Sequence, residues 1–392
     1  MDVEQKMEFD ETDIQDLIRQ GENASLEFKQ EDVRAESIAR EIVAFANRDG
    51  GTLLLGIADD GTVQGLSEEK NYEEWIANIA RNNVVPSVCT DFSLVLADGK
   101  KIALVIIPKG KDKPYQTRDG KYLIRVGTTN RVATQPELLR LFQTSGVFHY
   151  DLTPVPRTGM KDLNLTRVDS YFQRYQIDFS HESEDQKRNL LQNTDVLAES
   201  GELTLGGLLI FGTNPSRYLP QNGISFARFQ GKTLNEKLID KQNIDGNLDY
   251  QINIGTAMIK NLMPRPSEIR GTKREDTKYI YPDKVFRELL TNAVVHRNYA
   301  ISGSKVRVFL FDDRLEVISP GRLPNTVTIE KLRFGVSFAV NPVLVKFMEN
   351  LRYIDQLGRG LPMVCQEAAR NGRDVRFKEI GEEFKVVLEV SD

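Results

Sequence analysis

The first part of the chain alternates between strand-like and helix-like patterns of apolar residues. Residues 26–29 (LEFK) alternate apolar and polar side chains, which is the period of a half-buried strand. Apolar positions then recur at helical spacing over 38–46, and Asp49-Gly50-Gly51 ends this predicted helix because glycine adopts the left-handed conformation without a steric clash. The continuous apolar run 52–57 suits an interior strand, and the acidic turn 59–61 follows it.

The next segments predict a first domain that ends near His149. Further helices are expected at 10–20, at 68–82 and from Pro136, since proline is favoured in a first helical turn. Strands are expected at 88–96 and 101–107. They flank Asp98-Gly99, a two-residue hairpin signal, and Asp119-Gly120 is a second such signal.

The rest of the chain predicts a looser middle and a more regular end. Residues 150–165 are typical of a linker, 166–200 of helices, 203–215 (LTLGGLLIFGTNP) of a buried strand ending in a turn, and 267–281 of a polar loop. From Pro282 the pattern predicts a helix over 283–299, strands over 305–311 and 314–319, helices over 342–353 and 363–372, and a last strand over 382–390.

Composition and charge narrow the class of protein. The chain of 392 residues is 40% hydrophobic and 28% charged, with a net charge of −5, so a nucleic-acid contact would need a local basic patch. No apolar run reaches the roughly 18 residues of a membrane span, and the acidic start is unlike a secretory signal. Two isolated cysteines, Cys89 and Cys365, favour a reducing, cytoplasmic setting and argue against a thiolate metal site.

A polar stripe lies on the helix predicted after Pro282. Glu288, Asn292 and His296 recur every four residues, beside an apolar stripe. A carboxylate can orient an attacking water, and an amide oxygen one turn later can hold Mg²⁺ against phosphates. The spacing alone equally fits a solvated helix face. The downstream glycines Gly358 and Gly360 favour the first interpretation, because a glycine loop before a helix offers free backbone N–H groups to a phosphate.

Three phrases in this part resemble the C-terminal module of bacterial RecG-like transcriptional regulators: 287–299 (RELLTNAVVHRNY), 312–324 (DDRLEVISPGRLP) and 356–372 (QLGRGLPMVCQEAARNG). That module resembles a divergent member of the gyrase, histidine-kinase and MutL ATPase superfamily. The resemblance implies that Glu288 is the catalytic glutamate, that Asn292 binds Mg²⁺ with ATP, and that Gly358 and Gly360 belong to the phosphate loop. The adenine-reading aspartate of the superfamily falls near Ser319 or Gly321, where this sequence has no acid.

The opening phrases are similar to the AlbA-like domain of Schlafen proteins: 22–30 (ENASLEFKQ), 41–61 (EIVAFANRDGGTLLLGIADDG) and 122–133 (YLIRVGTTNRVA). The likeness covers roughly residues 15–145. It implies nucleic-acid binding, and some Schlafen members cut RNA with three carboxylates. The matching positions here are Glu22, Glu27 and Asp59 (or Asp60).

Three such acids can hold divalent cations that activate water against a phosphodiester. Glu22 and Glu27 are five residues apart, so the segment between them must turn if both are to face one metal. The alternative is that Glu27 forms a surface pair with Lys29 and that Asp59 belongs to an ordinary turn.

Basic residues with interleaved tyrosines follow the second predicted hairpin strand. Lysine and arginine neutralise phosphates, and tyrosines can stack on bases, so this stretch is the predicted nucleic-acid face. The alternative is a solvated hairpin whose charges protect its edge. The residues expected to bind are Lys113, Tyr115, Arg118, Arg125 and Arg131.

These patterns and resemblances together predict an α/β (α+β) fold with three parts. An AlbA-like mixed-sheet domain spans 1–149, a middle α/β linking region spans 150–281, and a divergent Bergerat-type α/β sandwich spans 282–392. The expected function is nucleic-acid binding modulated by ATP and Mg²⁺, in transcription regulation or phage defence, with weak ATPase activity left open. One rival is a metal-dependent nuclease using Glu22, Glu27 and Asp59. The other is a degenerate scaffold that forms homo-oligomers.

Overall fold

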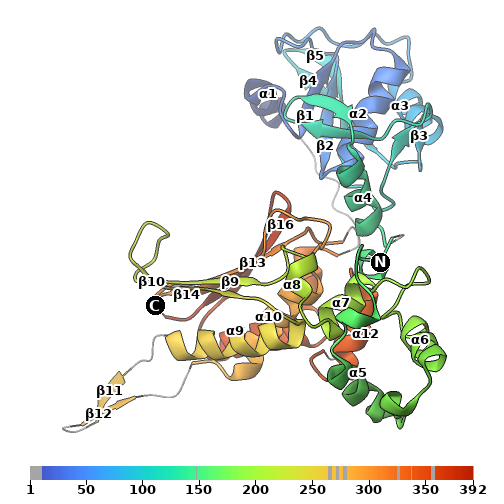
Figure 1. The fold of residues 1–392 in the computed structure, drawn as a ribbon. Coiled ribbons are helices and arrows are strands. Elements are labelled where there is room, and N and C mark those ends of the chain that lie inside the picture. The colour runs from blue at the N-terminus through green and yellow to red at the C-terminus, as the bar shows by residue number, and fades with distance from the viewer. Residues whose placement is uncertain are drawn as a thin grey trace. The chain divides into compact units, whose positions relative to one another are not determined.

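The chain folds into two compact units, Met1–Val147 and Phe148–Asp392 (Figure 1). The computed structural model describes residues 11–146, 148–263, 267–270, 273–276, 280–324, 327–336, 338–354 and 358–391. It contains both helices and sheets in each unit, so the expected α+β class is confirmed.

The first unit is built around a mixed sheet of four strands in the order β1-β2-β5-β4. Its helices are α1 (Glu11–Gln20), α2 (Ala35–Asn47), α3 (Tyr72–Asn82) and α4 (Gln135–Thr144). Its strands are β1 (Leu26–Lys29), β2 (Gly50–Leu55), β3 (Val84–Val85), β4 (Asp91–Ala97), β5 (Lys100–Pro108), β6 (Gln116–Thr117), β7 (Leu123–Val126) and β8 (Thr129–Val132). β1 and β2 are parallel, and β2 and β5 are antiparallel.

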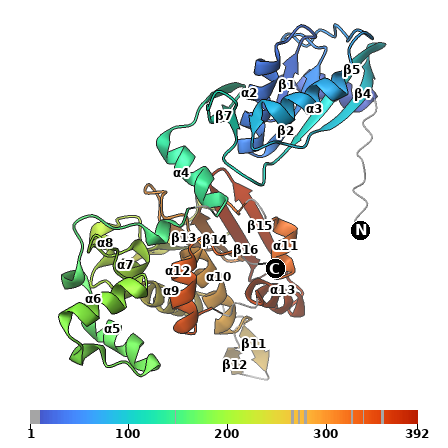
Figure 2. The same ribbon diagram turned by 90° about the vertical axis from the view of Figure 1, so that its right-hand side faces the viewer.

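Both faces of the sheet are covered at β2, where Leu53, Leu54 and Leu55 are fully buried. α2 and α3 pack on one face, where Leu53 and Leu55 of β2 meet the apolar side chains of the helices (Figure 2). α1 packs on the other face, where Ile14 meets Leu54 and Phe28. Alternate residues of a strand point to opposite faces, and this explains why the run 52–57 is continuously apolar.

The sequence predictions for this region are confirmed at β1, α2 and β2. Gly50 has a φ of +83°, the left-handed conformation expected after the helix. Asp98-Gly99 joins β4 to β5 as a tight hairpin, also as predicted. Asp119-Gly120 forms a turn in which the Gly120 N–H donates to the Thr117 carbonyl at 2.8 Å.

The second unit is built around a sheet of six strands in the order β10-β9-β13-β14-β16-β15. Its strands are β9 (Ile224–Phe229), β10 (Leu238–Ile244), β13 (Val306–Leu310), β14 (Arg314–Pro320), β15 (Val375–Ile380) and β16 (Glu383–Glu389). Its helices are α5 (Leu165–Phe172), α6 (Glu184–Asn193), α7 (Leu205–Phe211), α8 (Pro215–Tyr218), α9 (Leu248–Leu262), α10 (Asp283–Val295), α11 (Ile329–Arg333), α12 (Pro342–Asn350) and α13 (Gly360–Arg370). Short 3₁₀ turns lie at Tyr150–Leu152, Met160–Asp162, Gln173–Tyr175 and Phe179–His181.

The middle and the end of the chain share this sheet. β9 pairs with β13 in parallel, from Ile224 opposite Val306 to Arg228 opposite Leu310. α9 and α10 lie side by side against one face of the sheet (Figure 1). A single hydrophobic core runs from Val155 to Val390, so residues 150–281 are packed into the same body as the C-terminal module.

Two predictions of local structure in the middle region were wrong. Residues 203–215 were expected to form a buried strand, but α7 is a helix whose Thr204 cap accepts the Gly207 N–H at 2.9 Å. Every residue of α7 is buried, so the segment is apolar all round and has no helical period to detect. Within the predicted loop 267–281, β11 (Ser267–Arg270) and β12 (Lys273–Asp276) form an antiparallel pair.

Candidate functional site

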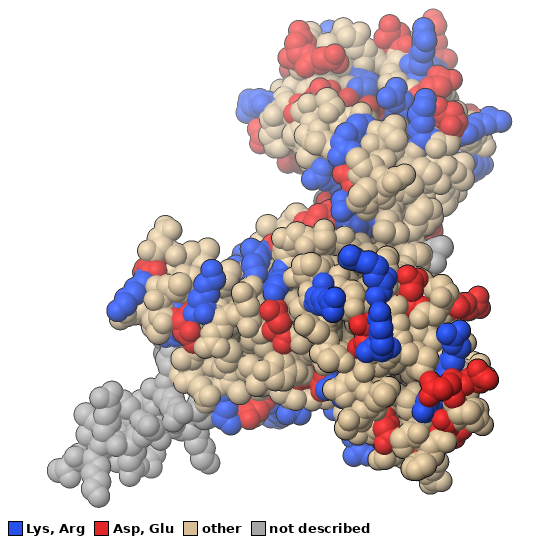
Figure 3. Space-filling model, in the orientation of Figure 1, with Lys and Arg blue, Asp and Glu red and all other residues tan. Residues whose placement is uncertain are grey.

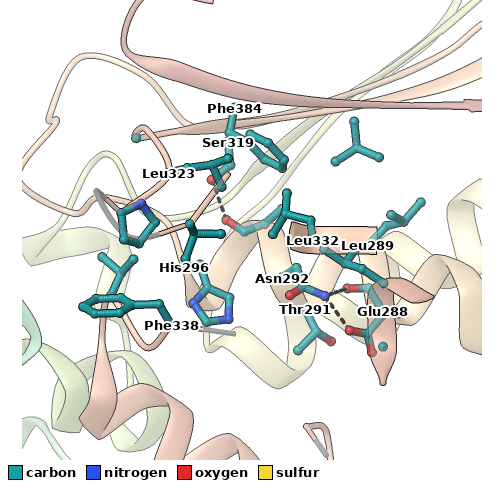
Figure 4. A pocket seen from close by; sticks show the side chains of 18 of the residues that line it. Glu288, Leu289, Thr291, Asn292, His296, Ser319, Leu323, Leu332, Phe338 and Phe384 are labelled. Atoms are coloured by element: carbon teal, nitrogen blue, oxygen red, sulfur yellow. Dashed lines mark hydrogen bonds between the residues drawn. The ribbon is translucent and has the colours of Figure 1, made fainter. Parts of the chain in front are cut away.

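One pocket of the second unit brings together the four residues predicted from its polar stripe and glycine loop. Glu288 and Asn292 reach it from α10, and Gly358 and Gly360 reach it from the start of α13. We call it the α10–α13 pocket (Figure 4). The remaining lining is mostly apolar and includes further residues of α10, β14, α11, α13 and β16 and of the loops beside them.

Within this pocket, Asn292 is held by Glu288. The side-chain amide nitrogen of Asn292 donates to Glu288 Oε1 at 2.5 Å and to the Glu288 carbonyl oxygen at 2.8 Å. Both contacts use the N–H groups, so the amide oxygen of Asn292 points away from Glu288 (Figure 4). A carbonyl oxygen oriented in this way is a ligand that Mg²⁺ accepts.

The glycine loop approaches the same carboxylate very closely. A Cβ atom on Gly360 would lie 1.8 Å from Glu288 Oε1, so a side chain at this position would displace the carboxylate. Gly358 has a φ of +66°, and its Cβ would lie 2.0 Å from the carbonyl oxygen of Gly335. The N-terminus of α13, where the first backbone N–H groups of a helix have no partner within the helix itself, is thereby brought to the polar end of the pocket.

The wall of the pocket offers neutral polar groups in place of an acid. Ser319 lines it and donates its hydroxyl to the Ala293 carbonyl at 2.7 Å, and Gly321 lies beside it. His296, which caps the C-terminus of α10, also lines the pocket; burial lowers its pKa to about 4, so its ring is neutral near pH 7. The side-chain hydroxyl of Thr291 is buried without a hydrogen-bond partner among the described residues.

These residues fit Mg²⁺ bound together with phosphates. The described part of the chain has no group of three or more His, Cys, Asp or Glu placed to hold a metal ion. A Mg²⁺ ion at this site would be coordinated by the side-chain oxygen of Asn292, by phosphate oxygens of the nucleotide and by water molecules. Mg²⁺ is commonly coordinated in this way at phosphate sites.

Among the described residues of the first unit, the three acids of the nuclease alternative do not form a group placed to hold a metal ion. Glu22 Oε1 accepts the backbone N–H of Phe28 at 3.0 Å, so the segment between Glu22 and Glu27 does turn. The carboxylate of Glu22 is therefore hydrogen-bonded to the backbone of β1. Glu27 is buried and forms ion pairs with Lys29 and Arg125. Asp59 is exposed at the end of β2.

Glu27 belongs to a buried cluster of charges that joins the β7–β8 hairpin to β1 and α2. Arg125, which is 1% exposed, lies 2.5 Å from Glu27 and 3.2 Å from Glu41. It also donates to the carbonyl oxygens of Asn23 and Leu26. Burial, and next the charge of Glu27, raises the pKa of Glu41. The predicted pairing of Glu27 with Lys29 exists, but it is buried.

The predicted basic face is divided between the interior and the surface. Tyr115 is buried and exchanges backbone hydrogen bonds with the side chain of Asn47, so it cannot stack on a base as it stands. Lys113 and Arg125 are also buried, and Lys113 donates to the Arg48 carbonyl. Of the five residues, Arg118 and Arg131 are exposed, with Arg131 in a bidentate pair with Glu137.

Two protein family models match parts of the chain, one in each unit. Residues 22–134 match the model of the Schlafen AlbA_2 domain. Residues 303–388 match the model described as "Putative ATP-dependent DNA helicase recG C-terminal". The chain combines a Schlafen AlbA_2 domain with a RecG-like C-terminal domain. These domain types indicate nucleic-acid and nucleotide binding, with Mg²⁺ the usual companion of the nucleotide.

The RecG-like match covers only part of the α10–α13 pocket. Gly358 and Gly360 lie inside it, whereas Glu288 and Asn292 on α10 precede it. Sequence reasoning identified these four residues but missed Gly335, whose carbonyl contacts the loop of Gly358. Gly335 follows α11 with a left-handed φ of +83°, and a glycine shortly after a helical segment was the signal that the sequence offered.

Two solved structures are distantly similar to this chain. The DIP2311 protein from Corynebacterium diphtheriae is 19% identical with a TM-score of 0.48, over 96% of this chain and 79% of that one. The N-terminal domain of a RecG-related protein from Nitrosomonas europaea is 25% identical with a TM-score of 0.24, over 30% of this chain and 92% of that one. No curated protein matches. Every helix in the described residues is too short or too polar to cross a lipid bilayer.

Proposed function

We propose that this protein binds nucleic acid through its Schlafen AlbA_2 domain, and ATP with Mg²⁺ in the α10–α13 pocket of its RecG-like unit. The observation that carries the proposal is the convergence of Glu288, Asn292, Gly358 and Gly360 in one pocket, although about 70 residues separate the two pairs. Groups that could bind Mg²⁺, a phosphate and the faces of a nucleobase ring therefore line the same pocket.

Each group in the pocket has a distinct role in this proposal. The amide oxygen of Asn292 is the protein ligand of Mg²⁺, which neutralises phosphate charge when bound. The backbone N–H groups at the start of α13 receive phosphate oxygens. Glu288 orients the attacking water if hydrolysis occurs. The apolar wall, which includes Leu289 and Val317, covers the base.

The nucleic-acid function rests on the family of the first unit and on its exposed cations. Arg118 is exposed on the turn after β6, and Lys121 is exposed beside it in a surface pair with Asp119. Exposed pairs contribute little to stability, so such cations can exchange a carboxylate for a phosphate. In this proposal the nucleotide state of the second unit changes the nucleic-acid affinity of the first, and the protein acts in the cytoplasm in transcription regulation or phage defence.

Isothermal titration calorimetry with Mg-ATP tests the nucleotide half. We expect a one-site isotherm for the full chain and its loss in Asn292→Ala. Asn193→Ala is the matched control, because Asn193 is an exposed residue at the end of α6. A flat isotherm for the unsubstituted protein at millimolar nucleotide contradicts the proposal.

The nucleic-acid half is tested separately by fluorescence anisotropy with labelled RNA and DNA strands. We expect saturable binding that weakens as salt rises and that changes when Mg-ATP is added. Binding that is unaffected by nucleotide removes the coupling and leaves the two sites independent. Absence of binding to either strand contradicts the assignment of the first unit.

A further inference from the structure

A second, polar pocket of the RecG-like unit is lined mainly by cations. Its lining residues are Arg157, Lys161, Asp162, Arg217 and Tyr218, and we call it the basic pocket. It shares no residue with the α10–α13 pocket. Figure 3 shows Lys and Arg side chains gathered on this face over α8 and beside α7. The family match to residues 303–388 does not include it.

Two chain segments are tied together to form this pocket. The Thr213 N–H, just before α8, donates to the Asp162 carbonyl at 2.8 Å. The Tyr218 hydroxyl donates to Asp162 Oδ1 at 2.7 Å, and the Gly159 N–H donates to Oδ2 at 3.0 Å. Both carboxylate oxygens of Asp162 are therefore used within the protein, and the residue fixes the two segments relative to each other.

The three cations, by contrast, have no carboxylate partner among the residues that the structure describes. Arg157, Lys161 and Arg217 are exposed, and no carboxylate of the described residues forms an ion pair with any of them. Arg217 lies with its guanidinium 5.4 Å from the centre of the Tyr218 ring. The hydrogen bond to Asp162 raises the pKa of Tyr218, and the positive charges of Arg217 and Arg157 oppose this shift more weakly.

The conformation of Arg157 also favours a role for its side chain. Its φ of +69° is left-handed, which costs a residue with a Cβ atom about 1 kcal/mol, and glycine would avoid this cost. Three cations placed around one carboxylate leave an excess of positive charge in a concave site. Arginine forks and a lysine ammonium are the groups that bind phosphate oxygens with charge-assisted hydrogen bonds.

We infer that the basic pocket binds a phosphate group, carried either by a nucleic-acid strand or by a free phosphorylated molecule. Arg157 and Arg217 would each offer paired N–H donors to its oxygens, and Lys161 a third positive charge. The inference is independent of nucleotide binding in the α10–α13 pocket, because the residues and the contacts are different.

The test compares two double variants of the full chain that lose the same charges. Lys161→Gln with Arg217→Gln removes two cations of the basic pocket and leaves Arg157 in place. Arg188→Gln with Lys241→Gln removes an exposed arginine and lysine elsewhere in the same unit. Binding is measured without Mg²⁺ for two probes, pyrophosphate by calorimetry and a labelled single strand of about 12 nucleotides by anisotropy.

We expect the basic-pocket variant to lose about tenfold in affinity for at least one probe, while the control variant stays within about twofold of the unsubstituted protein. Loss for the strand alone identifies a nucleic-acid backbone as the source of the phosphate, and loss for pyrophosphate alone identifies a free phosphorylated molecule. Equal affinities for both double variants, or no binding of either probe, overturn the inference. Thermal unfolding controls for folding, and Lys161→Gln alone replaces the double variant if its melting temperature falls.

Discussion

The side-chain amide nitrogen of Asn292 lies 2.5 Å from Oε1 of Glu288. The same carboxylate lies against Gly360, at the N-terminus of α13, where a Cβ atom would be 1.8 Å from it. In this arrangement a negative side chain lies close to the place where the backbone N–H groups of α13 would receive a phosphate. Glu288 therefore has two opposing effects on a bound nucleotide: it orients water for hydrolysis, and it repels phosphate charge.

This relationship predicts that Glu288→Gln binds Mg-ATP more tightly than the unsubstituted protein. Removing one negative charge near a helix N-terminus should increase affinity by about two- to thirtyfold, since such charges contribute about 0.3–2 kcal/mol. Any phosphate release should fall in the same variant, because glutamine cannot act as a base. Calorimetry and a phosphate-release assay measure the two effects, with Glu330→Gln on α11 as the charge-matched control. Weaker nucleotide binding by Glu288→Gln would show that the carboxylate supports the nucleotide directly.

A second prediction concerns the glycine loop. Gly358→Ala should lower both nucleotide affinity and stability, because the residue has a left-handed φ of +66° and its Cβ would meet the Gly335 carbonyl at 2.0 Å. The expected destabilisation is about 1–3 kcal/mol, measured by denaturant unfolding. Gly303→Ala is the control, because its Cβ would meet no atom within 4 Å and its φ is not in the left-handed range. Equal behaviour of the two variants would contradict the close loop packing.

Particular residues show which parts of the fold and of the candidate site could be predicted from the sequence. The elements β1, α2 and β2 were predicted because their apolar positions have a clear period. The residues of the α10–α13 pocket were predicted because helical spacing and the placement of glycines are local signals in a sequence. α7 was missed because a segment buried on all sides has no period. Tyr115 and Arg125 were predicted to lie on the nucleic-acid-binding surface, but both are buried. A sequence shows that a side chain is charged or aromatic, but it does not show which residue that side chain contacts. Arg125 reaches Glu27 and Glu41 across 98 and 84 residues.

The buried position of Arg125 gives a third prediction. Arg125→Ala should destabilise the first unit by about 3–5 kcal/mol, because it leaves Glu27 and Glu41 buried without their shared cation. Arg118→Ala should change stability by less than about 0.5 kcal/mol, since Arg118 is exposed, yet it should weaken nucleic-acid binding. Urea unfolding of the full chain, followed at the transition of the first unit, separates these outcomes. Similar unfolding midpoints for the two variants would mean that the charge cluster does not hold the hairpin.

The last prediction concerns pH and the fully buried Asp151 in the second unit. Its Oδ2 accepts the backbone N–H groups of Val343 and Leu344 at the start of α12, at 2.7 and 3.0 Å, while Oδ1 is buried with no partner in the part of the chain that the structure describes. Burial raises the pKa of Asp151 from 3.8 to about 6, and the two backbone hydrogen bonds lower it by less. Because the folded-state pKa is raised, this group favours folding below pH 4, and that contribution is lost as the pH rises through about 6.

Asp151→Asn should therefore remove part of the pH dependence of stability. Asparagine keeps an acceptor for the two N–H groups but never ionises, so the variant should match the unsubstituted protein near pH 4 and exceed its stability by about 1–3 kcal/mol at pH 7.5. Thermal unfolding across this pH range measures the difference, and Asp185→Asn on the exposed first turn of α6 controls for loss of a surface charge. If Asp151→Asn is instead less stable at pH 7.5, the ionised carboxylate is favoured at the N-terminus of α12, and the charge–helix interaction outweighs the cost of burial.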